Sequence, residues 1–156
     1  MAKVPDIDAK YMRLALEEAR VAAAMGEVPV GAVLVHEGEV IARAHNLKET
    51  VNDPTAHAEI LALRDGARKL ARWRLTDCVL YVTKEPCIMC SGAMINARLG
   101  RLVYACRDPK GGGAESLYKI PTDERLNHRV EITSGVLEEE CRELLRSFFE
   151  AKRVKI

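Results

Sequence analysis

The spacing of hydrophobic residues along the chain changes several times, and each change predicts a new helix or strand. Apolar side chains recur at helical spacing from Met12 to Ala22, and Gly26 ends that helix. The next stretch, VPVGAVLVHEGEVIARAHN, is rich in β-branched residues and has the turn-forming pair Glu37-Gly38 near its centre. We therefore expect a first helix, followed by two strands that are joined by a tight turn.

The second part of the chain predicts further helices and strands in alternation. PTAHAEILALRDGARKLA predicts a helix that begins at Pro54 or Thr55, because both residue types are favoured at helix starts. CVLYVT and RLVYAC have the length of buried strands, and they flank a third helix, PCIMCSGAMINAR. VEITSG predicts a short last strand before a helix from about Val136 to Arg153.

Strands that alternate with helices favour an α/β fold. We expect a three-layer α/β/α sandwich with a central mixed sheet of about five strands. The segment from CVLYVT to RLVYAC should form one right-handed parallel crossover within that sheet. The chain has no internal repeat and no Pro/Gly/Ser-rich linker, so we expect a single domain that spans residues 1–156.

Composition narrows the class of protein. Apolar residues make up 48% of the chain and charged residues 30%, which is ordinary for a folded soluble domain. The longest apolar run, VPVGAVLV, is far shorter than the roughly 20 residues that a membrane span needs. Five cysteines and an N-terminus without an apolar signal core favour a reduced, cytoplasmic protein. The net charge is only +1, so nucleic-acid binding would need local basic patches.

Three potential metal ligands lie at the starts of two predicted helices. His57 falls in the first turn of the second helix, and Cys87 and Cys90 fall in the first turn of the third. The two cysteines share one helix face because they are three residues apart. One nitrogen and two sulfurs suit zinc, and three protein ligands leave a fourth position for water. Zinc lowers the pKa of bound water to roughly 7, so the sequence predicts one zinc ion that supplies hydroxide.

Glu59 follows His57 by two positions, which corresponds to roughly 200° of rotation along a helix. Its carboxylate should therefore not share the direction of the ligand. We expect Glu59 to carry protons between the zinc-bound water and an atom of the substrate.

Three other interpretations of these residues stay open at this point. A lone histidine at a helix start is often a cap or a satisfied core group. A CxxC pair after a buried strand also occurs in thioredoxin-like redox proteins, although that account gives His57 and Glu59 no role. A structural zinc site would need a fourth ligand, for which the candidates are Cys78, Cys106 and His45.

The combination His-Ala-Glu followed by Pro-Cys-x-x-Cys resembles the signature of zinc-dependent nucleobase deaminases. From about residue 8 to residue 153 the chain is also similar to bacterial tRNA-specific adenosine deaminases. The stretches that carry this likeness are GEVPVGAVLV (26–35), HNL (45–47), DPTAHAEILALR (53–64), LYVTKEPCIMCSGAMINARLGRLVYACRDPKGG (80–112) and LNHRVEITSGVLEEEC (126–141).

The resemblance implies a cytidine deaminase-like fold and a homodimer that converts adenosine to inosine at the wobble position of a tRNA anticodon. The substrate would typically be an arginine tRNA. The zinc ligands in each subunit would be His57, Cys87 and Cys90, with Glu59 as the proton carrier. The alternative is a deaminase of a free nucleobase or nucleoside, such as guanine, cytidine or adenosine.

The resemblance also assigns contacts with the RNA. Asn46 would hydrogen-bond the flipped-out nucleotide, and Asp108 and Lys110 would meet the RNA backbone beside it. Lys84 departs from the pattern, because an apolar residue is expected before Glu85. This departure concerns local packing or RNA contact and touches no metal ligand.

Two basic clusters near predicted helices either contact RNA or simply face water. They consist of Arg64, Arg68, Lys69, Arg72 and Arg74, and of Arg142, Arg146, Lys152, Arg153 and Lys155. Phe148 continues an apolar stripe of the last helix and is expected in the core. Phe149 lies one step off that stripe, so both a core position and stacking on an RNA base remain open.

Overall fold

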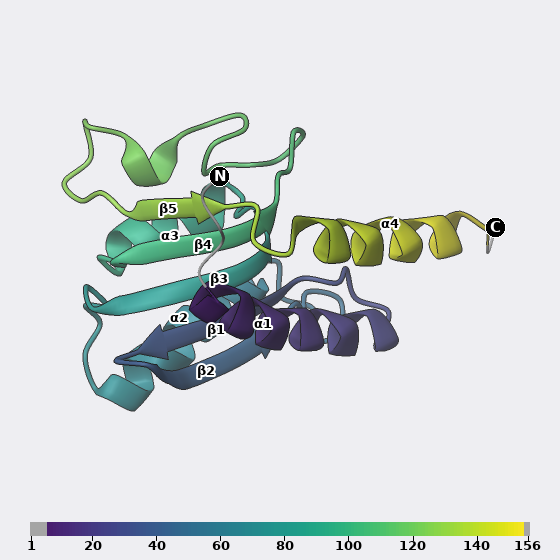
Figure 1. Ribbon diagram of the computed structural model, residues 1–156, viewed down its shortest axis with the longest axis horizontal. Helices are drawn as coiled ribbons and strands as arrows, with labels where there is room; N and C mark the ends of the chain where they lie inside the picture. Colours follow the sequence, from purple (N-terminus) through teal and green to yellow (C-terminus); the bar gives the residue numbers. More distant parts are fainter. Residues whose placement is uncertain (1–5, 155–156) are drawn as a thin grey trace.

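The structure is a computed structural model that describes residues 6–154 (Figure 1). The helices are α1 (Asp6–Ala24), α2 (Ala58–Leu70), α3 (Ile88–Asn96) and α4 (Glu138–Val154), with a short 3-10 helix, η1 (Ile120–Thr122). The strands are β1 (Gly31–His36), β2 (Glu39–His45), β3 (Cys78–Lys84), β4 (Arg101–Cys106) and β5 (Glu131–Ser134). Within residues 6–154, no helix combines the length and the apolar character that a membrane crossing requires.

One mixed sheet contains all five strands, as the sequence predicts, and their order is β2-β1-β3-β4-β5. β1 pairs antiparallel with β2 and with β3, whereas β3 pairs parallel with β4, and β4 with β5. The β1–β2 hairpin turns at Glu37 and Gly38, whose φ angles are 50° and 78°. Positive φ at both central residues matches the right-handed twist of the flanking strands and closes the predicted tight turn.

Two hydrophobic cores lie on opposite faces of the sheet (Figure 1). In β1, Ala32 and Leu34 pack with α2 and α3, whereas Val33 and Val35 pack with α1 and α4. This alternation follows from the two-residue period of a strand. The prediction of a three-layer α/β/α sandwich is confirmed.

The start of α2 differs from the prediction. α2 begins at Ala58 and not at Pro54 or Thr55. The Asp53 carboxylate accepts hydrogen bonds from the backbone N–H of Thr55 at 2.8 Å and from its hydroxyl at 2.7 Å. Such local side-chain bonds stabilise a turn in competition with a helix. Pro54 and Thr55 therefore belong to a turn before the helix.

α4 packs near its start on β3 and β4, and its C-terminal end extends beyond the sheet (Figure 1). Cys141 is buried in the core near the helix start, whereas residues 149–153 are exposed. Phe148 is half-buried and packs edge-on against Phe149, with 5.4 Å between the ring centroids. The expectation of a core position for Phe148 is therefore wrong, because this part of α4 has already left the sheet.

The strand directions bring three strand ends to one edge of the sheet. β3 and β4 are parallel neighbours, and their last residues, Lys84 and Cys106, are paired in register. β2 runs in the same direction as β3, because each is antiparallel to β1. The segments that follow β2, β3 and β4 therefore meet at this edge, which contains the candidate site.

Candidate active site

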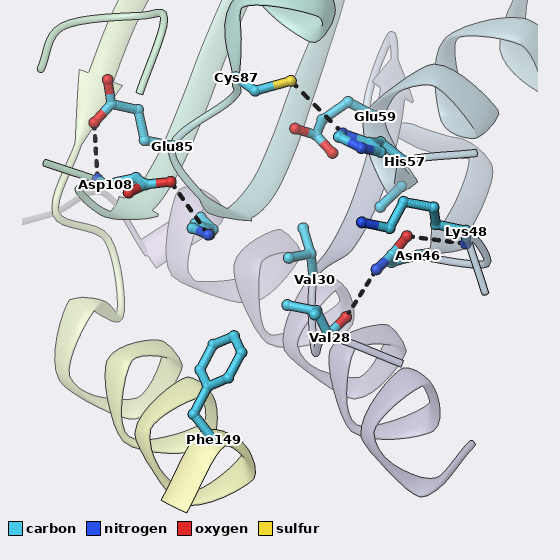
Figure 2. A pocket seen from close by; sticks show the side chains of 12 residues that line it. Val28, Val30, Asn46, Lys48, His57, Glu59, Glu85, Cys87, Asp108 and Phe149 are labelled. Carbon is cyan, nitrogen blue, oxygen red and sulfur yellow. Dashed lines mark hydrogen bonds and ion pairs between the residues drawn. The ribbon is translucent and has the colours of Figure 1, made fainter. Parts of the chain in front are cut away.

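A pocket of about 210 Å³ opens at this edge of the sheet (Figure 2). It is lined by Val28, Val30, Asn46, Lys48, His57, Ala58, Glu59, Lys84, Glu85, Cys87, Asp108 and Phe149. The fold thus brings together most of the site residues that were predicted from the sequence. Cys90 is fully buried next to His57, and Lys110 is exposed and not among the lining residues.

His57 and Cys87 each occupy the N-cap position of a helix, His57 in α2 and Cys87 in α3. Both residues have extended backbone, and neither side chain makes a capping hydrogen bond. The interpretation of His57 as a helix cap is therefore wrong. Its imidazole is directed instead toward Cys87, and both helix N-termini carry partial positive charge that favours a thiolate between them.

The distances between the three candidate ligands fit zinc. His57 Nδ1 lies 3.6 Å from Cys87 Sγ and 3.5 Å from Cys90 Sγ. Tetrahedral zinc with bonds of about 2.0 Å to nitrogen and 2.3 Å to sulfur places the nitrogen and a sulfur about 3.5 Å apart. All three ligand atoms lie within 4.8 Å of one another. Both the donor types and their spacing are therefore those of a zinc site.

The two cysteines stabilise a thiolate at this position. Hydrogen bonding from Cys90, together with that from His57, lowers the pKa of the Cys87 thiol to about 4 against the opposing effect of burial. The pKa of Cys90 is raised, first by its interaction with Cys87 and then by burial. One negative charge is thus shared by the pair beside the histidine, and a thiolate is the form of cysteine that binds metals.

Glu59 lies at the floor of the pocket next to this cluster (Figure 2). Its side chain is only 4% exposed, and burial raises the pKa of its carboxyl group. Glu59 is not one of the three clustered ligands, although it belongs to the same first turn of α2. A carboxyl group in this position is available for proton transfer.

A fourth protein ligand does not come from the candidates that the sequence offered. Cys106 Sγ lies 3.3 Å from the carbonyl oxygen of Thr83, and His45 Nδ1 lies 2.9 Å from a carboxylate oxygen of Glu18. Cys78 contacts its neighbour Asp77. None of the three belongs to the cluster around His57, so the arrangement does not match a four-ligand structural site.

The described residues contain a second group of potential metal ligands, which consists of His36, Glu37 and Asp77. The guanidinium of Arg72 lies 2.7 Å from one carboxylate oxygen of Asp77, and His36 Nε2 lies 2.8 Å from the other. The charge of Asp77 is therefore balanced by a side chain, and this group lies outside the pocket.

Asn46 forms one side of the pocket rim. It follows β2, is buried, and its Oδ1 accepts a hydrogen bond from the backbone N–H of Lys48 at 3.2 Å. The adjoining loop is held by Glu27, a fully buried carboxylate that accepts bonds from the backbone N–H groups of Glu49 and Thr50. The position of this side of the rim therefore depends on Glu27.

Asp108 lies on the opposite side of the rim, on the loop after β4 (Figure 2). Glu85 anchors this loop, because its carboxylate accepts hydrogen bonds from the backbone N–H groups of Asp108, Glu115 and Ser116. Burial alone would raise the pKa of Glu85, but these bonds, with that from the Ser116 hydroxyl, lower it. Glu85 is thus a buried anion at the centre of the loop.

The glycines of this loop are required by the closeness of that packing. A Cβ atom on Gly112 would lie 2.3 Å from the Glu85 carboxylate, and one on Gly113 would lie 2.7 Å from the backbone of Ile88. A side chain at either position would push the loop away from the start of α3. The glycine run therefore allows a close approach of the loop to the site.

Lys84, where the resemblance predicts an apolar residue, lines the pocket. Its ammonium lies 3.2 Å from Asp108 Oδ2, and its side chain is 29% exposed. Burial would raise the pKa of Asp108, but the charge of Lys84 and local hydrogen bonds lower it. Lys84 therefore forms an ion pair with Asp108 at the pocket rim.

Phe149 extends from α4 to the pocket (Figure 2). It is 44% exposed, so a core position is excluded and an exposed aromatic face remains beside the pocket. Of the nearby basic cluster, Arg142 and Arg146 form ion pairs with glutamates of α4 itself. Lys152 lies 5.0 Å from the ring centroid of Phe148, and Lys155 lies outside the described residues.

Comparison with known proteins shows the general class to which this protein belongs. Residues 7–153 match the family model of the MafB19-like deaminases. The chain also resembles a solved structure of a guanine deaminase from Nitrosomonas europaea, with a TM-score of 0.78 and 26% identity, covering 95% of this chain and 86% of that chain. The fold and the His/Cys/Cys cluster are thus those of a deaminase.

More similar relatives define the family within that class. A tRNA-specific adenosine deaminase from Bacillus subtilis is 49% identical over 95% of this chain and 92% of its own length. A solved structure from a study of A-to-I editing by tRNA:A34 deaminases is 46% identical, with a TM-score of 0.84, and covers 86% of this chain and 98% of that chain. The chain belongs to the family of tRNA-specific adenosine deaminases.

Proposed function

We propose that this chain deaminates adenosine to inosine at the wobble position, A34, of a tRNA anticodon. The observation that carries the proposal is the convergence of His57, Cys87 and Cys90 with Glu59 at the floor of one pocket. The relatives that are named tRNA-specific adenosine deaminase, and the structure related to A34 editing, support a tRNA adenosine as the substrate.

One zinc ion per subunit would be held by His57, Cys87 and Cys90. When bound there, zinc supplies Lewis-acid chemistry that makes water nucleophilic near neutral pH. The chain's own contribution is the positively polarised site between two helix N-termini, with the ligand atoms already at the spacing that zinc needs.

Glu59 would move the protons of the reaction. Hydrolysis replaces the amino group on C6 of adenine by oxygen from water and releases ammonia. One proton of the water must reach ring nitrogen N1, and the other must reach the departing amino nitrogen. Glu59 is suited to both transfers, because its buried carboxyl group lines the pocket and is not among the clustered ligands.

The walls of the pocket would bind and orient the base. Val28 and Val30 offer apolar contacts to its faces. Asn46 uses one amide hydrogen toward the carbonyl of Val28 and one side of Oδ1 toward the N–H of Lys48. Its second hydrogen and second lone pair remain for the edge of the base. Phe149 would stack on a base at the pocket mouth.

A base inside a duplex cannot reach a buried floor of this kind, so the target nucleotide must be flipped out of its stack. A single-stranded anticodon loop makes that step inexpensive. Asp108 lines the pocket at its rim and Lys110 follows on the same loop, where both would meet the RNA backbone.

The active form would be a homodimer in the cytoplasm, built from one deaminase domain that spans residues 1–156. An apolar groove between α2 and α3, which includes Ile60, Leu63 and Trp73, is suited to a second copy of the chain. Trp73 is 57% exposed in the single chain. Sedimentation equilibrium should give twice the mass of one chain, and Trp73→Glu should give the monomer.

The test of the activity is incubation of purified protein with an arginine tRNA that carries A34. Conversion appears as an A-to-G change in sequenced cDNA, with ammonia released in equal amount. The matched control is the same tRNA with G34. Guanine, cytidine and adenosine form the competing substrates, and ammonia from one of these without conversion of the tRNA would overturn the proposal.

A further inference from the structure

We propose that Lys84 binds a phosphate of the RNA at the pocket rim, with Asp108 as the residue that positions its ammonium. This inference rests on the proposed function, because it concerns how the same pocket holds its substrate.

The fold places the two side chains together. Lys84 is the last residue of β3, and its in-register partner Cys106 is the last residue of the parallel strand β4. Asp108 follows two residues after that end. Lys84 Nζ lies 3.2 Å from Asp108 Oδ2, and both residues line the pocket. The ion pair therefore lies where substrate must pass.

Asp108 is itself held firmly. Its Oδ1 accepts hydrogen bonds from the backbone N–H groups of Lys110 and Gly111, both at 3.1 Å. Its own backbone N–H donates to the buried carboxylate of Glu85 at 3.0 Å. Only Oδ2 is directed to Lys84, so the ammonium has a fixed partner on one side. An ammonium group has three donors, which leaves two for another acceptor.

The charges of the residues that line the pocket bear on whether that acceptor is a phosphate. The lining residues include three carboxylates, Glu59, Glu85 and Asp108, and two ammonium groups, Lys48 and Lys84. Without Lys84, the side of the rim that contains Asp108 would repel a phosphate. With it, the charge of Asp108 is balanced, and the partly exposed ammonium of Lys84 still has donors that are not directed to Asp108.

The two lysines also fit the path of a flipped nucleotide. The base enters the pocket toward Glu59, while the phosphates on its 5′ and 3′ sides stay at the rim. Lys48 lies across the pocket from Asp108, the partner of Lys84 (Figure 2). Each lysine thus faces one side of the RNA backbone at the rim, and Lys84 lies on the side formed by the ends of β3 and β4.

The experiment measures the salt dependence of binding to an anticodon stem-loop that carries A34. All proteins carry Glu59→Gln, so that the RNA is bound without turnover. Lys84→Met should weaken binding about threefold to fivefold at low salt, the upper range for a partly exposed charge pair. The slope of log affinity against log salt should become shallower by about 0.7, the value for one contact with a single strand.

Lys10→Met is the matched control, because it removes the same charge at the end of α1 that lies away from Val28 and the pocket. It should leave the slope unchanged. Lys84→Arg should restore the slope, since it restores the charge. In the active enzyme, Lys84→Met should raise KM with kcat nearly unchanged.

Asp108→Asn separates phosphate binding from a purely structural ion pair. If Lys84 contacts phosphate, Lys84→Met still lowers the slope in the Asp108→Asn background. If Lys84 only balances Asp108, the second substitution has no further effect, and this outcome overturns the inference. A parent protein that fails to bind the stem-loop would instead contradict the proposed function.

Discussion

The floor and the rim of the pocket are built in different ways. The floor consists of His57, Glu59, Cys87 and Cys90, which belong to the starts of two helices that pack on the sheet. The rim consists of side chains at the end of β3, on loops and on α4, such as Lys84, Asp108 and Phe149. Short sequence motifs position the side chains of the floor, whereas contacts between residues far apart in the sequence position those of the rim.

Two buried glutamates illustrate that difference. Glu27 anchors the loop after β2, and Glu85 anchors the loop after β4, each by accepting backbone hydrogen bonds. Neither would take part in the chemistry at C6. With the roles proposed above, catalysis and recognition would depend on separate sets of residues, which substitutions can test one at a time.

The largest effect is expected for a ligand at the floor. Cys90→Ala removes one of the three donors and should abolish both zinc binding and deamination. The measurement is metal content by mass spectrometry together with ammonia release. Cys141→Ala is a control, because Cys141 is equally buried but lies on the other face of the sheet. Full activity of a zinc-free preparation would contradict the assignment of the floor.

A smaller but still large effect is expected for the proton carrier. Glu59→Gln should keep zinc and reduce kcat by about 10² to 10⁴, the usual contribution of a general acid or base. Because the amide has nearly the same shape as the carboxyl group, binding of the stem-loop should persist. Loss of the metal in this variant would make Glu59 a ligand instead.

Substitution of Glu85 or Glu27, which anchor the loops of the rim, should lower the stability of the fold more than it lowers the rate of deamination. Glu85→Gln replaces a charged acceptor of several backbone N–H groups and should reduce the free energy of unfolding by about 2 kcal/mol. Hydrogen exchange should increase for residues 108–116. Glu27→Gln is the counterpart and should increase exchange at residues 49–50. An equal increase in hydrogen exchange throughout the chain would show that Glu85 and Glu27 stabilise the whole fold and not only these loops.

Phe149→Ala tests recognition at the rim. Stacking on one base contributes about 1 to 3 kcal/mol, so affinity for the stem-loop should fall by that amount. The melting temperature should hardly change, because Phe149 is 44% exposed. A lower melting temperature with normal affinity would return Phe149 to a packing role.

The smallest effect is expected at the end of α4. If Lys152 and Arg153 bind phosphates, replacing both with glutamine should lower the salt slope by about 0.7 for each phosphate that is no longer bound. Arg146→Gln is the control, since Arg146 already pairs with Glu143 and Glu150. An unchanged slope in the double variant would leave both charges as a solvated helix end.

The floor could be predicted from the sequence because its residues are close neighbours within two short motifs. His57 and Glu59 are two positions apart, and Cys87 and Cys90 are three apart, so each motif places its side chains at one helix start, although His57 and Cys87 are extended N-cap residues just before the helices. The five strands of the sheet could also be predicted, because apolar runs of strand length alternate with helical segments.

The rim could be predicted less well, because its geometry depends on contacts between distant residues. Glu85 directly precedes Pro86-Cys87, but nothing local shows that its carboxylate binds a loop 30 residues later. Glu27 lies in the stretch GEVPVGAVLV, but nothing local shows that its carboxylate binds the backbone of residues 49 and 50. The position of Phe149 depends on where α4 leaves the sheet, which the period of its apolar stripe does not reveal.

The overhang of α4 has a consequence for which substitutions the chain tolerates. Its first turns are held in the core through Cys141, whereas its last turns lie past the sheet and contribute Phe149, Lys152 and Arg153. Changes in the overhanging turns carry little folding cost, because few buried contacts depend on them. If Phe149, Lys152 and Arg153 contact RNA as proposed, substitutions in these turns would change RNA recognition without disturbing the floor of the pocket.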